Sequence, residues 1–335
     1  MSVILAIIAG VSLGYILERG NMCFHSTIRG IFRQPREMDL FRAYLLTLLI
    51  ATPLVASLSS LGLIAPWIPP FAWQANIVGG LIFGIGMVIA SSCITGLFYK
   101  LGHGMVGTLV ALLMWGIGDY LTYRGPLSPF RDQLNQVQIS VGGQSATLLN
   151  MHPALRVSLI VIAISIVIWL IRSPRQSRNP YWNWVILGMV AGLCTGLSWL
   201  VADWGGSNYP YGTSGVPTSL ILTLTNGDPL WAPWITISLF SIVFGAFVAA
   251  RRSGTLWVRG ETVSRYGELA MGGLLMGVGS AISGGCNLGH SLIGVPLLSL
   301  GSITTTLSIV VGIFVSHHIL ARLKLALSKN NRVPA

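Results

Sequence analysis

The chain has 335 residues, of which 53% are hydrophobic and only 9% are charged, and its mean hydropathy is +0.73. Because a soluble globular protein carries about 25% charged residues, this composition excludes a soluble domain and indicates an integral membrane protein. The net charge of +11 would suit a nucleic-acid-binding protein, but the positions of the basic residues argue against that class.

The apolar runs, taken in chain order, predict an all-α membrane protein with about nine transmembrane helices and short re-entrant helices. The first run leads directly into Glu18 and Arg19 and has no small-residue cleavage site, so we expect it to be kept rather than removed as a secretory signal. The longest polar gap, about 123–155, predicts a loop with a short surface helix. The nine runs lie at about 3–17, 42–63, 74–94, 104–122, 156–171, 182–202, 232–250, 267–284 and 302–321.

Lysine and arginine are divided unequally between the two sides of the predicted membrane domain. When the loops are assigned to alternate sides, 17 of the 20 basic residues fall on one side, and only Arg124, Arg131 and Arg156 fall on the other. The positive-inside rule then predicts a bacterial inner-membrane protein with its N-terminus outside and its C-terminus in the cytoplasm. We therefore expect the basic residues to fix the topology and contact anionic lipids, and we expect no nucleic-acid partner.

A glycine-rich segment that ends near a cysteine occurs twice. Residues 79–96 (GGLIFGIGMVIASSCITG) and 272–289 (GGLLMGVGSAISGGCNLG) align at a constant offset of 193, with eight of 18 positions identical. The copies fall in the third and eighth predicted spans, so they run in opposite directions, as in transporters that bind their substrate between two inverted repeats. We predict one transmembrane domain with repeat 1 over about 1–123, a linking loop and span over 124–181, repeat 2 over about 182–321 and a cytoplasmic tail over 322–335.

Three of the four cysteines lie where small or polar residues interrupt an apolar run. Cys23 lies in RGNMCFHS, Cys93 in ASSCITG and Cys286 in SGGCNLGHS, whereas Cys194 lies within a predicted span and is expected to be an ordinary buried side chain. The cysteines are far apart in sequence and form no CxxC pair, which argues against paired redox thiols. Their spacing from histidine does not fit a zinc site, so we expect no metal or cofactor.

These cysteines suit a soft sulfur oxyanion as the transported substrate. An anion within the membrane needs hydrogen-bond donors that replace its water, and no Lys or Arg is expected inside a span, so backbone N–H groups at helix N-termini and glycine turns should supply them. A protonated thiol is a weak donor that suits a terminal sulfur, and we predict a relay along the three thiols without covalent bonding.

Further residues are predicted to support this path. Gly96 and Gly289 should allow the chain to break just past each cysteine, and Arg19 and Arg29 should attract anions from the cytoplasmic side. The supporting donors and turns are Ser91, Ser92, Thr95, Gly96, Thr213, Ser214, Gly284, Gly285, Asn287 and Gly289.

Three motifs give the chain a resemblance to the YeeE/YedE family of bacterial inner-membrane proteins, over nearly its whole length. The family's Arg-Gly-x-x-Cys-Phe, Cys-x-Thr-Gly and Gly-Gly-Cys-x-x-Gly stretches match residues 19–24, 93–96 and 284–289. The resemblance implies that the substrate is thiosulfate and that the three cysteines line the conduction path. Family members often have a second Arg where this chain has Asn21, and Gly-Gly where it has Ser91 and Ser92.

Two other functions stay open. A thiol-redox or selenium-handling membrane protein would carry a disulfide or a covalent sulfur adduct on the three cysteines. An intramembrane serine protease would use Ser214 of the GTSG stretch as nucleophile and His290 as base, although such a pattern arises easily in a chain with 40 glycines. For a transporter, the basic inner face is a docking surface for a soluble sulfur-carrier protein.

Overall fold

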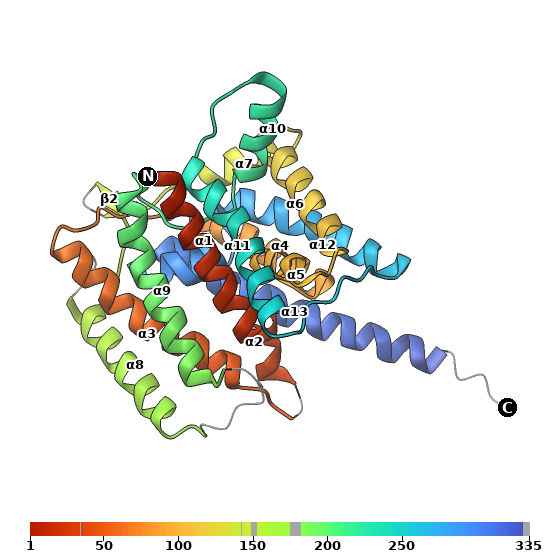
Figure 1. The fold of residues 1–335 in the computed structure, drawn as a ribbon, viewed down its shortest axis with the longest axis horizontal. Helices are drawn as coiled ribbons and strands as arrows, with labels where there is room; N and C mark the ends of the chain where they lie inside the picture. The colour runs from red at the N-terminus through yellow and green to blue at the C-terminus, as the bar shows by residue number, and fades with distance from the viewer. Residues whose placement is uncertain (34, 142, 149–152, 175–181, 331–335) are drawn as a thin grey trace.

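The computed structural model describes residues 1–33, 35–141, 143–148, 153–174 and 182–330, and nearly all of its regular structure is helical (Figure 1). One antiparallel hairpin of two-residue strands interrupts the series of helices. The elements are α1 Ser2–Gly20, α2 Phe24–Phe32, α3 Asp39–Ser60, α4 Trp73–Ala90, α5 Ile94–His103, α6 Thr108–Tyr123, α7 Ser128–Asn135, β1 Ser140–Val141, β2 Gln144–Ser145, α8 Pro153–Ile171, α9 Trp184–Trp204, α10 Val216–Asn226, α11 Pro233–Arg252, α12 Val263–Ser283, the π-helix η1 Leu288–Gly294, the 3-10 helix η2 Val295–Leu297 and α13 Leu300–Asn330.

Each of the nine apolar runs coincides with a helix, but fewer helices meet the length and hydropathy that a membrane crossing requires. Six described helical segments are long and apolar enough to cross a membrane, or seven when the bent pair α12–η1 is counted as one span. Helix α6 has only 16 residues, and the apolar part of α8 covers Val157–Ile171. The described structure therefore supports a multi-pass α-helical protein with six to seven candidate spans.

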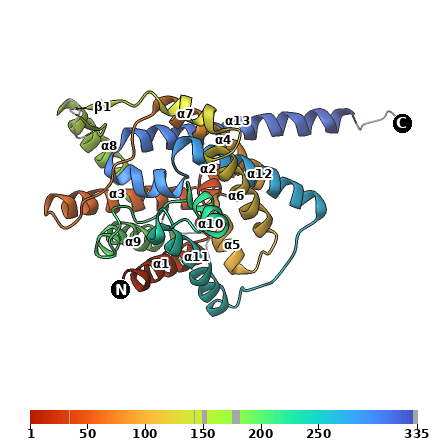
Figure 2. The ribbon, with the colours of Figure 1, turned by 90° about the horizontal axis from the view of Figure 1, so that it is seen from above.

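The long helices form two groups that meet along the middle of the molecule. Helix α3 packs on α9, and α1 packs on both α9 and α11, whereas α4 packs on α12 and α13 and α6 packs on α12. In both views α3, α8 and α9 lie on one side, with α6 and α12 on the other (Figure 1, Figure 2). The C-terminal part of α13 extends away from this bundle.

Glycines bring the backbones of α4 and α12 into direct contact. A Cβ atom at Gly79 would lie 2.7 Å from the carbonyl oxygen of Gly279, and one at Gly86 would lie 2.8 Å from that of Gly272. A Cβ at Gly272 or Gly279 would meet Gly86 or Gly79 in return, at 2.7 Å. Such close approach is how small residues hold helices together in a membrane, and it explains why the glycines occur in both copies.

The polar gap at about 123–155 contains the predicted short helix, α7, and also the hairpin, which the sequence analysis did not predict. Two-residue strands are too short to produce an alternating pattern. Arg131 and Asn135 of α7 donate hydrogen bonds of 3.1 Å to the carbonyl oxygens of Ala281 and Ile282. Helix α7 therefore covers the C-terminal end of α12, where carbonyl groups lack partners within the helix.

Candidate functional site

Three long helices, α1, α4 and α12, end in the same way. The residue after each helix is left-handed, with φ of 48° at Asn21, 51° at Ser91 and 79° at Gly284. Glycine adopts this conformation freely and asparagine tolerates it, whereas a serine there is uncommon. The prediction that Gly96 and Gly289 make the breaks is wrong, because Gly96 lies inside α5 and Gly289 lies inside η1.

Each left-handed residue is followed two positions later by a cysteine at the start of a short helix. Cys23 and Cys93 are the N-cap residues of α2 and α5, and Cys286 lies just before the N-cap of η1. The backbone N–H of Gly96 donates to the Cys93 sulfur, and that of Leu288 donates to the Cys286 sulfur, both at 3.2 Å. The sulfurs thus occupy helix N-termini, where N–H groups favour negative charge.

The structure brings Cys23 and Cys93 together although 70 residues separate them. Their sulfurs lie 3.4 Å apart, and the backbone N–H of Cys93 donates to the Cys23 sulfur at 3.5 Å. Both side chains are buried, with exposures of 0% and 1%. A Cβ at Gly96 would lie 2.9 Å from the Cys23 sulfur, so glycine is needed for this close approach. The two thiols are adjacent although their sequence spacing gave no sign of it, and both cysteines are free.

Cys286 lies in the second break, beside Thr213 of the chain between α9 and α10. The Thr213 side chain is buried, and its hydroxyl has no hydrogen-bond partner among the described residues. Tyr44 of α3 is buried and packs its ring against Phe24, with centroids 5.3 Å apart. Tyr44 therefore lies beside the residue that follows Cys23, and the sequence analysis missed it because no motif surrounds it.

Three of the predicted supporting residues have a buried polar atom that finds no hydrogen-bond partner in the described residues. These atoms are the hydroxyl oxygens of Thr95, in the first turn of α5, and of Thr213, in the chain between α9 and α10, and the amide oxygen of Asn287, at the start of η1. A buried polar group without a partner costs about 1–3 kcal/mol. Thr95 and Asn287 lie within two residues of a cysteine in sequence, where a bound ligand would supply the missing partner.

The chain between α9 and α10 was expected to supply Thr213 and Ser214 as donors for the path, but the helix N-terminus that follows is already filled. The buried carboxylate of Asp119, from α6, accepts hydrogen bonds from the N–H groups of Gly215 (3.0 Å) and Thr218 (3.2 Å) and from the Thr218 hydroxyl (2.5 Å). An internal anion thus occupies the N-terminus of α10, as a carboxylate commonly does.

Ser214 and His290 do not form a catalytic pair. The Ser214 hydroxyl bonds to the Tyr123 hydroxyl at 2.8 Å and donates to the carbonyl oxygen of Ser280 at 2.9 Å. The ring of His290 bonds to the Ser302 hydroxyl at 3.1 Å and, through its other nitrogen, to a backbone carbonyl at the end of α12 at 3.0 Å. Both ring nitrogens are engaged away from Ser214, so the serine protease hypothesis is wrong.

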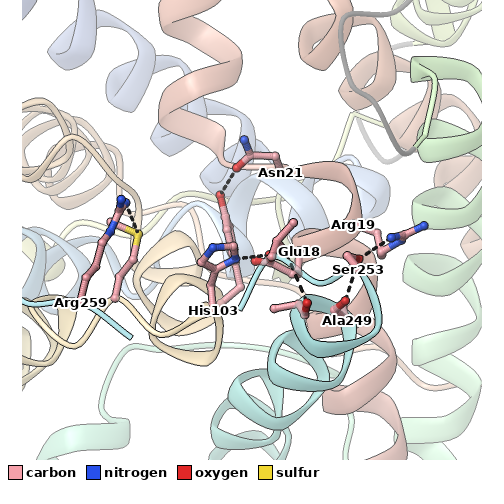
Figure 3. Close-up of polar contacts among 11 residues, drawn as sticks. Glu18, Arg19, Asn21, His103, Ala249, Ser253 and Arg259 are labelled. Atoms are coloured by element: carbon pink, nitrogen blue, oxygen red, sulfur yellow. Dashed lines mark hydrogen bonds and ion pairs between the residues drawn. The ribbon is translucent and has the colours of Figure 1, made fainter. Parts of the chain in front are cut away.

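A cavity of about 750 Å³ lies where the C-terminal ends of α1 and α5 meet α2. In its wall Glu18 pairs with the ring of His103 at 2.5 Å, and Asn21 accepts a hydrogen bond of 3.2 Å from the Tyr99 hydroxyl (Figure 3). This bond gives Asn21, the left-handed residue that ends α1, a second role. The cavity therefore adjoins the turn that leads to Cys23.

The two arginines predicted to attract anions have different surroundings. Arg29 lines the cavity, whereas the Arg19 guanidinium donates to the Ser253 hydroxyl of α11 (Figure 3). Arg29 is therefore placed to contact an ion in the cavity, and Arg19 joins α1 to α11.

Lys100 is a basic residue that the sequence analysis assigned to topology alone. It lies in the last turn of α5, inside the candidate span Trp73–His103 but beyond the apolar run at about 74–94. Its ammonium donates to the Ser92 hydroxyl at 3.0 Å and to the carbonyl oxygen of Ser91 at 3.4 Å. The sequence does contain a signal that could have placed Lys100 near Cys93. Lys100 is seven positions after Cys93, and residues at this spacing lie on the same face of a helix.

Comparisons with known proteins identify the family of this chain. The model of a family described as Sulphur transport matches residues 19–315. The thiosulfate transporter TsuA of Spirochaeta thermophila is 31% identical over 91% of this chain and 95% of its own length, and TsuA of Escherichia coli is 24% identical over 86% of each chain. The probable transporter YedE of Salmonella typhimurium is 33% identical over 30% of this chain and 25% of its own. The resemblance found in the motifs is thus confirmed, and the chain belongs to the Sulphur transport family, whose members are transporters rather than enzymes.

Proposed function

We propose that this chain imports thiosulfate across the bacterial inner membrane along a path lined by Cys23, Cys93 and Cys286. The full-length relatives are thiosulfate transporters. The observation that carries the proposal is the pair of buried sulfurs of Cys23 and Cys93, 3.4 Å apart at the N-termini of α2 and α5. A soft terminal sulfur suits a site beside two thiols better than a hard oxygen does.

The chemistry of the path follows from its donors. Thiol S–H groups and the N–H groups of the first turns of the short helices would replace part of the water that the anion loses on entry. The hydroxyl of Thr95, which has no partner in the described structure, is a further donor beside Cys93. Each contact is weak, so the ion is passed from one thiol to the next without a covalent bond, as conduction requires.

The pairing of helices supports two inverted repeats, α1–α6 and α9–α13, and hence nine crossings. Helix α1 packs on α11 as α9 packs on α3, and α6 packs on α12 as α13 packs on α4. If α1 corresponds to α9, α3 to α11, α4 to α12 and α6 to α13, each contact has a counterpart in the other half. Helices α4 and α12, which carry the duplicated segment, pack on one another.

The proposed orientation places the N-terminus outside and the C-terminus in the cytoplasm. It rests on the 17 basic residues assigned to one side, of which Arg175, Arg178 and Arg332 lie outside the described residues. The cavity near Lys100 then faces the cytoplasm, where anionic lipids and a soluble sulfur-carrier protein would meet the basic surface.

Growth tests the proposal most directly. A host that lacks its own sulfur-uptake systems and expresses this chain should grow on thiosulfate as sole sulfur source, and sulfate should compete poorly. A host with the empty vector should not grow. If the expressed chain reaches the membrane and growth on thiosulfate does not exceed that of the empty vector, the proposal is wrong.

The Cys23–Cys93 distance also favours a second candidate, a thiol-redox function. Two sulfurs 3.4 Å apart would need little movement to form a disulfide. Mass spectrometry of protein purified without reductant distinguishes the two functions. The transport proposal expects free thiols on Cys23, Cys93 and Cys286, whereas the redox function expects a Cys23–Cys93 disulfide or a sulfur adduct.

A further inference from the structure

Lys100 lies between the cavity and the cysteine pair. Its side chain lines the 750 Å³ cavity, and its ammonium donates to the Ser92 hydroxyl at 3.0 Å. The Ser92 hydroxyl in turn lies 4.0 Å from the Cys23 sulfur. One side chain thus connects the open volume of the cavity to the two buried sulfurs.

The positive charge of Lys100 is not neutralised by the carboxylates around the cavity. Each of these carboxylates is bonded to another basic side chain, and no described carboxylate forms an ion pair with Lys100. The pairs are Glu18 with His103 at 2.5 Å, Glu37 with Arg33 at 3.1 Å and Asp39 with Arg42 at 3.3 Å. A half-buried charge without a counter-ion is unfavourable, so this position favours a bound anion.

The other basic residues of the cavity lie in different surroundings. Arg259 places its guanidinium over the ring of Trp257, 5.3 Å from the centroid, and donates to the sulfur of Met105 (Figure 3). Among the described basic residues that line the cavity, Lys100 is the one hydrogen-bonded to Ser91 and Ser92, next to Cys93. Lys100 is therefore the cation best placed to act on an ion held at the sulfur pair.

We propose that Lys100 is the residue that makes the site selective for a doubly charged substrate. With the terminal sulfur of the ion at Cys23 and Cys93, its oxygen atoms would extend toward the Lys100 ammonium and the Ser92 hydroxyl. Lys100 then discriminates a dianion from a monoanion with the same terminal sulfur. This inference rests on the proposed transport function and adds the basis of charge selectivity to it.

Equilibrium binding to the purified full-length chain tests the inference. Lys100→Gln removes the charge but keeps a hydrogen-bond donor for Ser92, Lys100→Arg keeps the charge, and Arg252→Met removes an exposed charge outside the cavity. The ligands are thiosulfate and methanethiosulfonate, in which a methyl group replaces one charged oxygen. We expect Lys100→Gln to raise the Kd for thiosulfate about tenfold, the effect of losing one favourable charge contact, and to change the Kd for methanethiosulfonate little.

The controls separate selectivity from folding. Lys100→Arg should recover part of the preference for thiosulfate, and Arg252→Met should behave as wild type. The inference is overturned if Lys100→Gln keeps the wild-type preference for the dianion. It is also overturned if Lys100→Gln lowers the unfolding temperature and the affinity for both ligands alike, because Lys100 then serves only as a cap for the end of α4. A wild-type chain that binds neither ligand would instead contradict the proposed function.

Discussion

The break between α4 and α5 and the break between α12 and η1 share one local design but have different surroundings. In both, a left-handed residue precedes a cysteine by two positions, and a backbone N–H donates to the sulfur at 3.2 Å. Cys93 in the first break also has the Cys23 sulfur 3.4 Å away and Lys100 nearby, whereas no second thiol is hydrogen-bonded to Cys286 in the described residues. The duplicated segment thus gives each break a similar position for its sulfur, and the surrounding segments give the two sulfurs different neighbours.

The break between α9 and α10 extends this comparison. The N–H groups at the start of its short helix, α10, have no partners within the helix. Here the carboxylate of Asp119 accepts three hydrogen bonds, two from these N–H groups and one from the Thr218 hydroxyl. The N-terminus of α10 is thus occupied by the protein's own anion, unlike those that we propose as substrate sites. The predictions below test these differences, beginning with the one expected to have the largest effect.

Replacing the cysteines should show that the first break contributes more than the second. Cys93→Ala should abolish thiosulfate uptake in whole cells, because it removes one of two adjacent sulfurs, and Cys286→Ala should reduce uptake less. Cys194→Ala, in the middle of α9, is the matched control and should leave uptake unchanged. Wild-type uptake by single alanine variants of Cys23, Cys93 and Cys286 would refute the relay.

The contact between α4 and α12 should be sensitive to a single methyl group. A Cβ at Gly279 would lie 2.6 Å from the backbone nitrogen of Phe83, so Gly279→Ala should push the two helices apart and destabilise the protein by about 1–3 kcal/mol. The unfolding temperature in detergent measures this effect. Gly267→Ala on the same helix, where a Cβ meets nothing within 4 Å, should be neutral or slightly stabilising. Equal unfolding temperatures for the two variants would contradict the described packing.

The internal anion at α10 should matter for stability. Asp119→Ala leaves the N–H groups of Gly215 and Thr218 without their acceptor, and we expect a loss of about 2 kcal/mol in the free energy of unfolding. Asp119→Asn keeps an acceptor oxygen and should lose less. If Asp119→Ala unfolds at the wild-type temperature, the carboxylate is not what stabilises this helix N-terminus.

Ser214 should have the smallest effect. Ser214→Ala loses the hydrogen bonds to Tyr123 and to the Ser280 carbonyl, which together stabilise by about 1 kcal/mol, and uptake should be unchanged. Ser60→Ala, at an exposed position at the end of α3, is the control for the assay. Loss of uptake by Ser214→Ala at an unchanged unfolding temperature would move this hydroxyl into the substrate path.

The breaks could be predicted from sequence because their signals are local. Small and polar residues interrupt apolar runs at Cys23, Cys93 and Cys286, and every predicted run coincides with a helix. The exact positions of the turns were predicted wrongly. Glycine is the usual left-handed residue, so the breaks were expected at the glycines after the cysteines, but the left-handed residue at position 91 is a serine. The nine crossings, the inverted repeat and the relay stay predictions.

The contacts between breaks could not be predicted, because they depend on packing between distant segments. Nothing in the sequence near Cys23 indicates that Cys93 is its neighbour. Lys100 was counted as a topology charge because a lysine near the end of an apolar run usually is one. The sequence places the acidic residue Asp119 in a predicted span but does not indicate its hydrogen-bond partners, which are almost 100 residues away in the chain.

The glycine contacts between α4 and α12 have a consequence for how the path opens and closes. The two backbones touch at Gly79, Gly86, Gly272 and Gly279 without intervening side chains, and tightly packed surfaces of this kind resist sliding. Rocking one half of the bundle against the other would separate all of these contacts at once. We therefore infer that α4 and α12 remain a fixed axis, and that the first turns of α2, α5 and η1 make the small movements that admit and release each ion.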